Sequence, residues 1–74
     1  MQLHRFTNGG FVIHRIQLPG MVTRVSAWFD AAGILLDCES IDSRHRSRKV
    51  HASRLHEIQV IGNRYKHTPT LSYN

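Results

Sequence analysis

Four permanent positive charges and one histidine lie within six consecutive residues near the middle of the chain. The cations are Arg44, Arg46, Arg48 and Lys49, and His45 lies between the first two. In an extended segment, alternate side chains point to the same side about 6.6 Å apart, so the three arginines would share one side. Guanidinium groups bind phosphate or carboxylate oxygens through paired hydrogen bonds. The cluster therefore predicts contact with nucleic-acid phosphates. The alternatives are a solvated loop that offsets the nearby acids, or contact with an acidic protein.

One tryptophan and three further arginines could extend this basic surface. Strand alternation would place Trp28 on the same side as Arg24, and an aromatic ring beside a guanidinium can stack on a nucleic-acid base. Packing in the core is the alternative for Trp28. We expect three supporting cations around the main cluster: Arg24, Arg54 and Arg64.

The other chemically active residues form no recognised catalytic, cofactor or metal motif. Cys38 is the only cysteine, which excludes an intrachain disulfide and a cysteine-based zinc site. Its spacing to His45, His51 and His56 matches no standard zinc pattern. An acid–base site for RNA cleavage could be drawn from His45 or His56 with Arg54 and Glu57, but any short chain with six histidines offers such combinations. We expect no enzyme activity, no cofactor and no metal.

Length and charge point to one small basic domain. The 74 residues carry a formal charge of +5, and four of the five acids fall between Asp30 and Asp42, just before the basic cluster. The lone thiol of Cys38 fits a reducing compartment, and no apolar run is long enough to cross a bilayer. We therefore expect a cytoplasmic protein without a membrane partner. Residues 1–62 should form one β-rich domain, and residues 63–74 a flexible C-terminal tail.

Turn residues divide the first 41 residues into short segments that are typical of strands. Residues 3–6 and 11–17 predict a hairpin across Asn8-Gly9, a dipeptide that suits a two-residue type I′ turn. Residues 21–29 and 34–41 predict a second hairpin. Both pairs are rich in β-branched and aromatic residues, as strands are.

The second hairpin has a predicted register that gives it one apolar face. A four-residue turn at 30–33 would pair Phe29 with Ile34. The same register gives these further pairs: Ala27 with Leu36, Val25 with Cys38, Arg24 with Glu39 and Trp28 with Leu35. A slip by one residue would scatter the apolar set over both faces, which favours this register.

The last part of the domain is open to two interpretations. The preferred one is a helical turn at 51–55 and a fifth strand at 57–61, because the latter residues are β-branched and alternate. The other is a helix over 52–61. The stretch KVHASRLHEI at 49–58, with the hairpin before it, resembles the small SH3-like β-barrels over residues 21–61. The resemblance implies a mainly β fold, a small five-stranded barrel with one short helical turn; the full helix would instead give a small α+β domain.

SH3-like barrels serve as nucleic-acid binders, peptide binders and inhibitors of host factors, so the resemblance alone does not choose a function. With the basic cluster, we expect a small module that binds DNA or RNA through phosphates and does no catalysis. The alternative is a regulatory protein of phage or plasmid type. It would bind an acidic patch on a host enzyme such as a polymerase or a defence nuclease. A homodimer joined through exposed strand edges is compatible with either.

Overall fold

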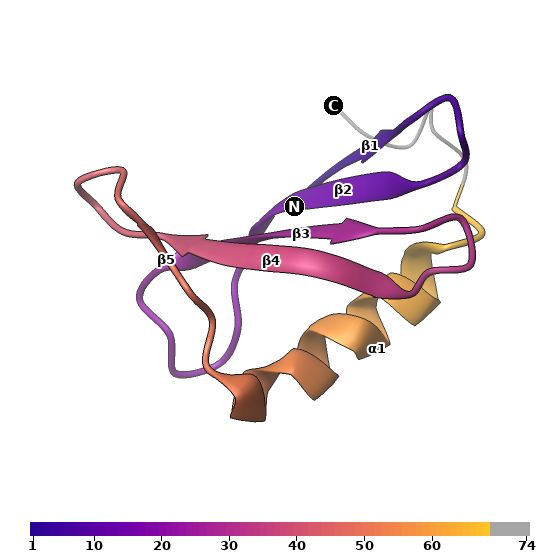
Figure 1. Ribbon diagram of the computed structural model, residues 1–74. Helices are drawn as coiled ribbons and strands as arrows, with labels where there is room; N and C mark the ends of the chain where they lie inside the picture. Colours follow the sequence, from indigo (N-terminus) through magenta and orange to yellow (C-terminus); the bar gives the residue numbers. More distant parts are fainter. Residues whose placement is uncertain (69–74) are drawn as a thin grey trace.

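The structure is a computed structural model that describes residues 1–68, and it shows a five-stranded antiparallel sheet with one helix against it (Figure 1). The sheet has the strand order β1-β2-β3-β4-β5, and each strand pairs with its neighbours in the sequence. The strands are β1 (Gln2–Arg5), β2 (Phe11–Ile16), β3 (Arg24–Phe29), β4 (Leu35–Ile41) and β5 (Ser47–Arg48). A 3₁₀ turn, η1 (Ala52–Arg54), leads directly into α1 (Leu55–Tyr65). The predicted mainly β fold is confirmed.

Three of the strand connections are built on the same five-residue turn. In each, the first residue's N–H donates to the carbonyl of the fifth, and the fourth residue's N–H donates to the carbonyl of the first. The turns run from Phe6 to Gly10, from Asp30 to Ile34 and from Asp42 to Arg46. The first hairpin therefore has three loop residues, and the predicted two-residue turn at Asn8-Gly9 is wrong. Asn8 instead uses its Oδ1 to accept from the Gly10 N–H at 2.9 Å.

The register predicted for the β3–β4 hairpin is also wrong. Phe29 pairs with Leu35, not Ile34, because the Asp30 carboxylate accepts from the N–H groups of Ala32 and Ile34 and holds Ile34 inside the turn. A bulge between Leu35 and Asp37 then adds a second shift. The remaining pairs are Trp28 with Asp37, Ala27 with Cys38, Ser26 with Glu39, Val25 with Ser40 and Arg24 with Ile41. The two shifts keep the apolar face of β3 inward and leave Ile34 and Leu36 exposed.

Residues 52–65 are helical, so the alternative interpretation of this segment is confirmed and the predicted strand at 57–61 is wrong. The Ser53 N–H donates to His51 Nδ1 (3.1 Å), which caps the start of η1. Ile58 is fully buried under the sheet, and this burial outweighs the strand preference of its β-branched neighbours. The fifth strand is Ser47–Arg48. It lies in the basic cluster at 44–49, for which the sequence allowed either an extended segment or a solvated loop.

The helix runs through Gly62, across the predicted boundary between residues 62 and 63, and ends at Tyr65. A Cβ on Gly62 would collide with the Phe29 ring, so this glycine allows the helix and the β3–β4 hairpin to approach each other closely. Residues 63–65 therefore belong to the folded domain, and the predicted domain end at residue 62 comes too early. The part of the predicted tail at 69–74 lies outside the described residues.

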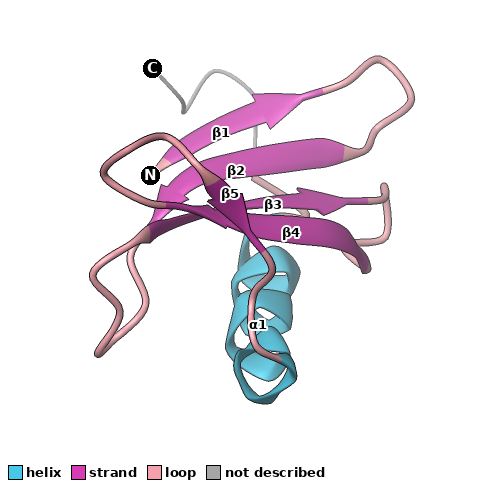
Figure 2. Cartoon of the chain, turned by 60° about the vertical axis from the view of Figure 1, so that its left-hand side comes forward, coloured by secondary structure: helices cyan, strands magenta, loops and turns pink. Residues whose placement is uncertain are grey.

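The two faces of the sheet differ. One face carries the main core, and Figure 2 shows α1 lying against it. The buried core residues are Leu3, Phe11, Ile13, Ile16, Leu18, Val25, Ala27, Phe29, Val50 and Ile58. No helix of residues 1–68 packs on the other face, called here the open face, and no helix of that part of the chain is long and apolar enough to cross a bilayer.

Candidate functional site

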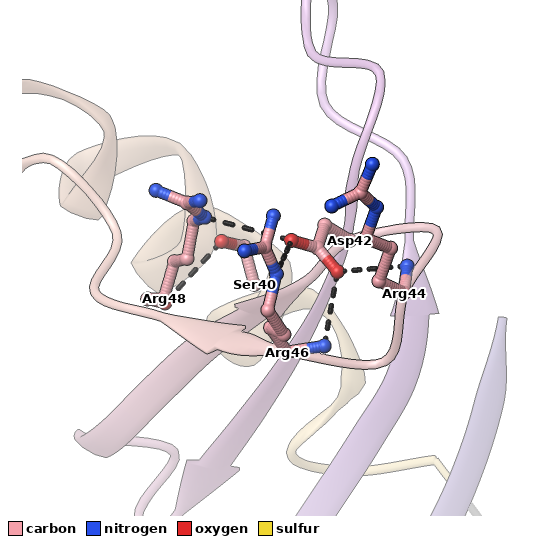
Figure 3. A network of polar contacts seen from close by, with 5 residues as sticks. All are labelled: Ser40, Asp42, Arg44, Arg46 and Arg48. Atoms are coloured by element: carbon pink, nitrogen blue, oxygen red, sulfur yellow. Dashed lines mark hydrogen bonds and ion pairs between the residues drawn. The ribbon is translucent and has the colours of Figure 1, made fainter.

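The turn between β4 and β5 is organised around the carboxylate of Asp42 (Figure 3). One oxygen, Oδ1, accepts from the backbone N–H groups of Arg44 and Arg46 at 2.9 Å each. The other, Oδ2, lies 3.0 Å from Nε of Arg46 and 3.6 Å from Nε of Arg48. These hydrogen bonds, first that from the backbone of Arg46, hold the pKa of Asp42 below its usual range. The carboxylate is therefore ionised and fully engaged at neutral pH.

This network divides the predicted basic cluster into two parts. Arg46 and Arg48 share one side and both approach the same Asp42 oxygen, whereas Arg44 lies in the turn and is not in an extended segment. The predicted common side therefore holds two arginines and not three. Arg44 and Lys49 are exposed and form no ion pair with any residue between 1 and 68.

A hollow of about 390 Å³ lies on the open face beside this turn. Its lining residues come from β1, β2, β3, β4 and the β4–β5 turn: Gln2, His14, Arg15, Arg24, Ser26, Ile41, Asp42 and His45. Gln2 belongs to one edge strand and His45 to the turn that leads into the other, so the sheet curls round this hollow. We call it the cationic hollow.

Two residues of the cationic hollow have an unusual backbone. Arg15 and His45 both have φ of +60°, and they are the only non-glycine residues with positive φ among residues 1–68. Arg15 sits in a bulge of β2 between Ile13 and Ile16. His45 occupies the fourth turn position, which is Gly9 and Gly33 in the other two turns. Strained positions of this kind concentrate at functional sites, and here both residues line the same hollow.

The charges in the cationic hollow are mostly unopposed. Arg15 and Arg24 are exposed and form no ion pair within the described part of the chain. Arg24 faces Ile41 because of the shifted register, so the predicted pairing with Glu39 does not occur. Glu39 instead accepts from Ser47 Oγ at 2.7 Å. The arrangement can bind an anion with several oxygen acceptors.

Trp28 lies next to the cationic hollow on the same face of β3 as Arg24. Its ring and that of His14 are nearly perpendicular, with ring centroids 6.2 Å apart, and His14 Nδ1 lies 2.8 Å from Ser26 Oγ. Val12, between His4 and Trp28 on the neighbouring strands, is buried although it points away from the main core. Trp28 thus lies outside the main core, over a small second apolar cluster, and is half-buried; its predicted stacking on a base stays a prediction.

Two predicted supporting cations do not join this face. Arg54 donates to the Pro19 carbonyl (2.7 Å) and pairs with Glu57 (2.7 Å), which ties the start of the helix to the β2–β3 loop. Arg64 is exposed in the last turn of α1, in the helical layer on the other side of the sheet. Of the predicted set, the structure brings Arg24 to the cationic hollow and places Trp28 beside it.

Sequence reasoning missed Arg15 and His14. An unbroken alternation along β2 would have given His14 but pointed Arg15 to the core face, and nothing in the sequence marks the bulge that turns it outward. Burial, and then the charge of Asp37, raise the pKa of the Cys38 thiol, which lowers the fraction present as thiolate. Among residues 1–68, no three of the histidine, cysteine and acidic side chains gather as a metal site requires.

No family of known proteins, no curated protein and no solved structure matches this chain.

Proposed function

We propose that this chain is a small nucleic-acid-binding module that holds phosphates on the open face of its sheet and does no catalysis. One observation carries the proposal: three residues converge on one hollow, namely Arg15 and His45 with positive φ and Arg24, and neither arginine has an ion pair among residues 1–68. Guanidinium groups are well suited to phosphate oxygens because their N–H donors form a planar fork. Exposed Arg44 at the adjoining turn adds a further contact for a longer strand.

The electrostatics support an extended polyanion better than a single carboxylate. The acids nearest to the cationic hollow are already engaged, Asp42 by the turn and Glu39 by Ser47, so they offer little competition for an incoming ligand. Arg46 and Arg48 share one carboxylate between them, which leaves net positive charge on that side of the turn. The net charge of +5 favours association with polyanions over a longer range.

The likeness to SH3-like barrels and the cytoplasmic location belong to the same proposal. A curled five-stranded antiparallel sheet is compatible with a small barrel-like fold. Nucleic-acid binding is one of several roles that such barrels serve. The single cysteine, with a thiol that burial makes less acidic, favours a reducing compartment.

The test is a salt titration of binding to a labelled oligonucleotide, followed by fluorescence anisotropy. The double variant Arg15→Ala/Arg24→Ala should weaken binding and flatten the slope of log K against log salt by about 0.7 to 0.9 for each lost phosphate contact. The matched control is Arg64→Ala/Lys66→Ala, which removes the same charge from the C-terminal end of the helical layer and should keep the slope. Equal effects of the two double variants, or no salt dependence in the unmodified protein, would overturn the proposal.

A protein partner is the second candidate, and the edge of β4 favours it. β5 pairs only with Ser40 and Ile41, so the stretch from Leu35 to Glu39 has no strand neighbour on that side within the described chain. An apolar groove of about 260 Å³ runs beside it, lined in part by Leu35, Val50 and Leu55. An extended segment of another protein could add to such an edge. A partner that survives nuclease treatment and is lost with Leu55→Glu would support this candidate.

A further inference from the structure

We infer that the nucleic acid bound on the open face is single-stranded, with bases lodged in an apolar hollow next to the cationic one. The inference rests on the proposed function and adds to it the class of nucleic acid. It starts from a second hollow, of about 500 Å³, which follows the cationic hollow along β3 on the open face. Its lining includes Phe6, Trp28, Asp30, Ala32 and Leu36. We call it the apolar hollow.

The apolar hollow has the chemistry of a base-binding surface. Phe6 is 40% exposed and Leu36 is 66% exposed, so both side chains are accessible to a ligand that enters the hollow. The one charged group in the lining is Asp30, and its Oδ1 already accepts from the N–H groups of Ala32 and Ile34. Aromatic side chains of this kind provide stacking platforms for bases of any type.

Trp28 connects the two hollows. Along β3, the side chains of Arg24, Ser26 and Trp28 share the open face, at intervals of about 6.6 Å. Arg24 and Ser26 line the cationic hollow, and Trp28 lines the apolar one. Phosphate-binding and base-binding groups therefore follow one another on a single strand of the sheet. A nucleic-acid strand presents phosphates and bases in the same close succession.

This order of groups favours a single strand over a duplex. In a duplex, the faces of the bases are stacked on their neighbours, and only the base edges are accessible in the grooves. Phe6 and Trp28 could then make no ring-to-ring contact, and only the cationic residues would bind. In a single strand the bases can be unstacked and laid on aromatic side chains. The buried Val12 and the neighbouring His14 keep the Trp28 ring in place before any ligand arrives.

The experiment uses the fact that Trp28 is the only tryptophan of the chain, so tryptophan fluorescence, excited at a wavelength that tyrosine does not absorb, reports on this site alone. Three probes are titrated at one salt concentration: a single-stranded DNA 12-mer, the duplex of the same sequence and inorganic polyphosphate. The single strand should quench Trp28 and bind more tightly than the duplex. Phe6→Ala should weaken single-strand binding about 5- to 150-fold, the range for loss of one base stack, and leave polyphosphate binding unchanged.

Val22→Ala is the matched control, because Val22 is 97% exposed in the β2–β3 loop and lines neither hollow. It should leave all three affinities unchanged. Equal affinity for single strand and duplex, with no effect of Phe6→Ala on either, would overturn the inference and leave phosphate binding intact. Absence of salt-dependent binding to all three probes would overturn the proposed function as well. Circular dichroism of each variant separates loss of a contact from loss of the fold.

Discussion

His45 occupies the turn position that is glycine in the β1–β2 and β3–β4 turns, which have the same hydrogen-bond pattern. Gly9 and Gly33 have φ of +91° and +85°, and His45 has +60°. A left-handed conformation costs an ordinary L-residue roughly 1–2 kcal/mol, which glycine avoids. His45 is exposed and lines the cationic hollow, so its side chain is presented to solvent at the expense of backbone strain. Such an arrangement points to a role in binding and not in stability.

His45→Gly should therefore stabilise the protein and weaken ligand binding. Relief of strain is partly offset by the greater freedom of glycine in the unfolded chain, so we expect a net gain of about 0.5–1 kcal/mol in the free energy of unfolding. Urea denaturation followed by Trp28 fluorescence measures the gain. Anisotropy with a labelled oligonucleotide measures the loss of affinity.

Gly20→Ala is the reciprocal control. Gly20 has φ of +78° and an added Cβ would meet no atom within 4 Å, so the substitution changes backbone strain without a steric clash. It should destabilise the protein by about 1 kcal/mol, opposite in sign to His45→Gly. If His45→Gly lowered stability as well, the histidine side chain would have to support the turn itself, and its assignment to ligand binding would fail.

At the scale of elements, α1 depends on a glycine that helix propensity disfavours. Gly62 lies within the helix, where glycine is less favourable than alanine by about 1 kcal/mol. A glycine is needed here because the Phe29 ring occupies the space that a Cβ would need, and the Gly33 carbonyl oxygen lies close by. The helix predicted over 52–61 stopped before Gly62 because the packing partner of this glycine lies 33 positions away and leaves no local pattern.

Gly62→Ala should destabilise the protein despite the higher helix propensity of alanine. Overpacking of a well-filled core typically costs about 1–3 kcal/mol, which exceeds the gain in propensity. His56→Ala, at an exposed position of the same helix, should instead be neutral or raise stability by up to about 0.7 kcal/mol. Thermal denaturation by circular dichroism compares the two. A rise in stability for both variants would mean that helix and hairpin are not in close contact at Gly62.

The strands were predictable from local residues, but their register was not. Alternation and turn residues located the first two hairpins, because each strand shows its own apolar face in the sequence. The β3–β4 pairing is shifted by the side-chain hydrogen bonds of Asp30 and by a bulge at Leu36, and the alternation of apolar residues, which set the predicted register, carries no signal for either. The residues of the candidate site divide in the same way, into those that strand alternation predicts and those that depend on a bulge. Arg24 and Trp28 were found from strand alternation, whereas Arg15 reaches the cationic hollow only through a bulge.

At the scale of the whole molecule, Arg5 joins the first strand to the last turn of the helix. Its guanidinium donates to the carbonyl oxygens of Gly9 (3.0 Å) and Thr68 (2.9 Å) and lies within 3.4 Å of those of Tyr65 and Lys66. It also lies over the Phe11 ring, 4.9 Å from the centroid. A cation at the carbonyl end of a helix is favourable for the helix dipole. One side chain thus links residues about 60 positions apart in the sequence.

Arg5→Ala should lower the free energy of unfolding by about 2–3 kcal/mol, from the lost hydrogen bonds and the lost cation–π contact. A domain of this size has only modest stability to lose. Arg5→Lys keeps the charge but has no planar fork to reach Gly9 and Thr68 together, so it should restore less than half of the loss. Arg64→Ala, which removes an exposed charge from α1, should stay within about 0.5 kcal/mol of the unmodified protein.

Amide hydrogen exchange then tests the link between β1 and α1, because β1 and the last turn of α1 should lose protection together in Arg5→Ala. Loss of protection in β1 alone would show that Arg5 supports only its own strand.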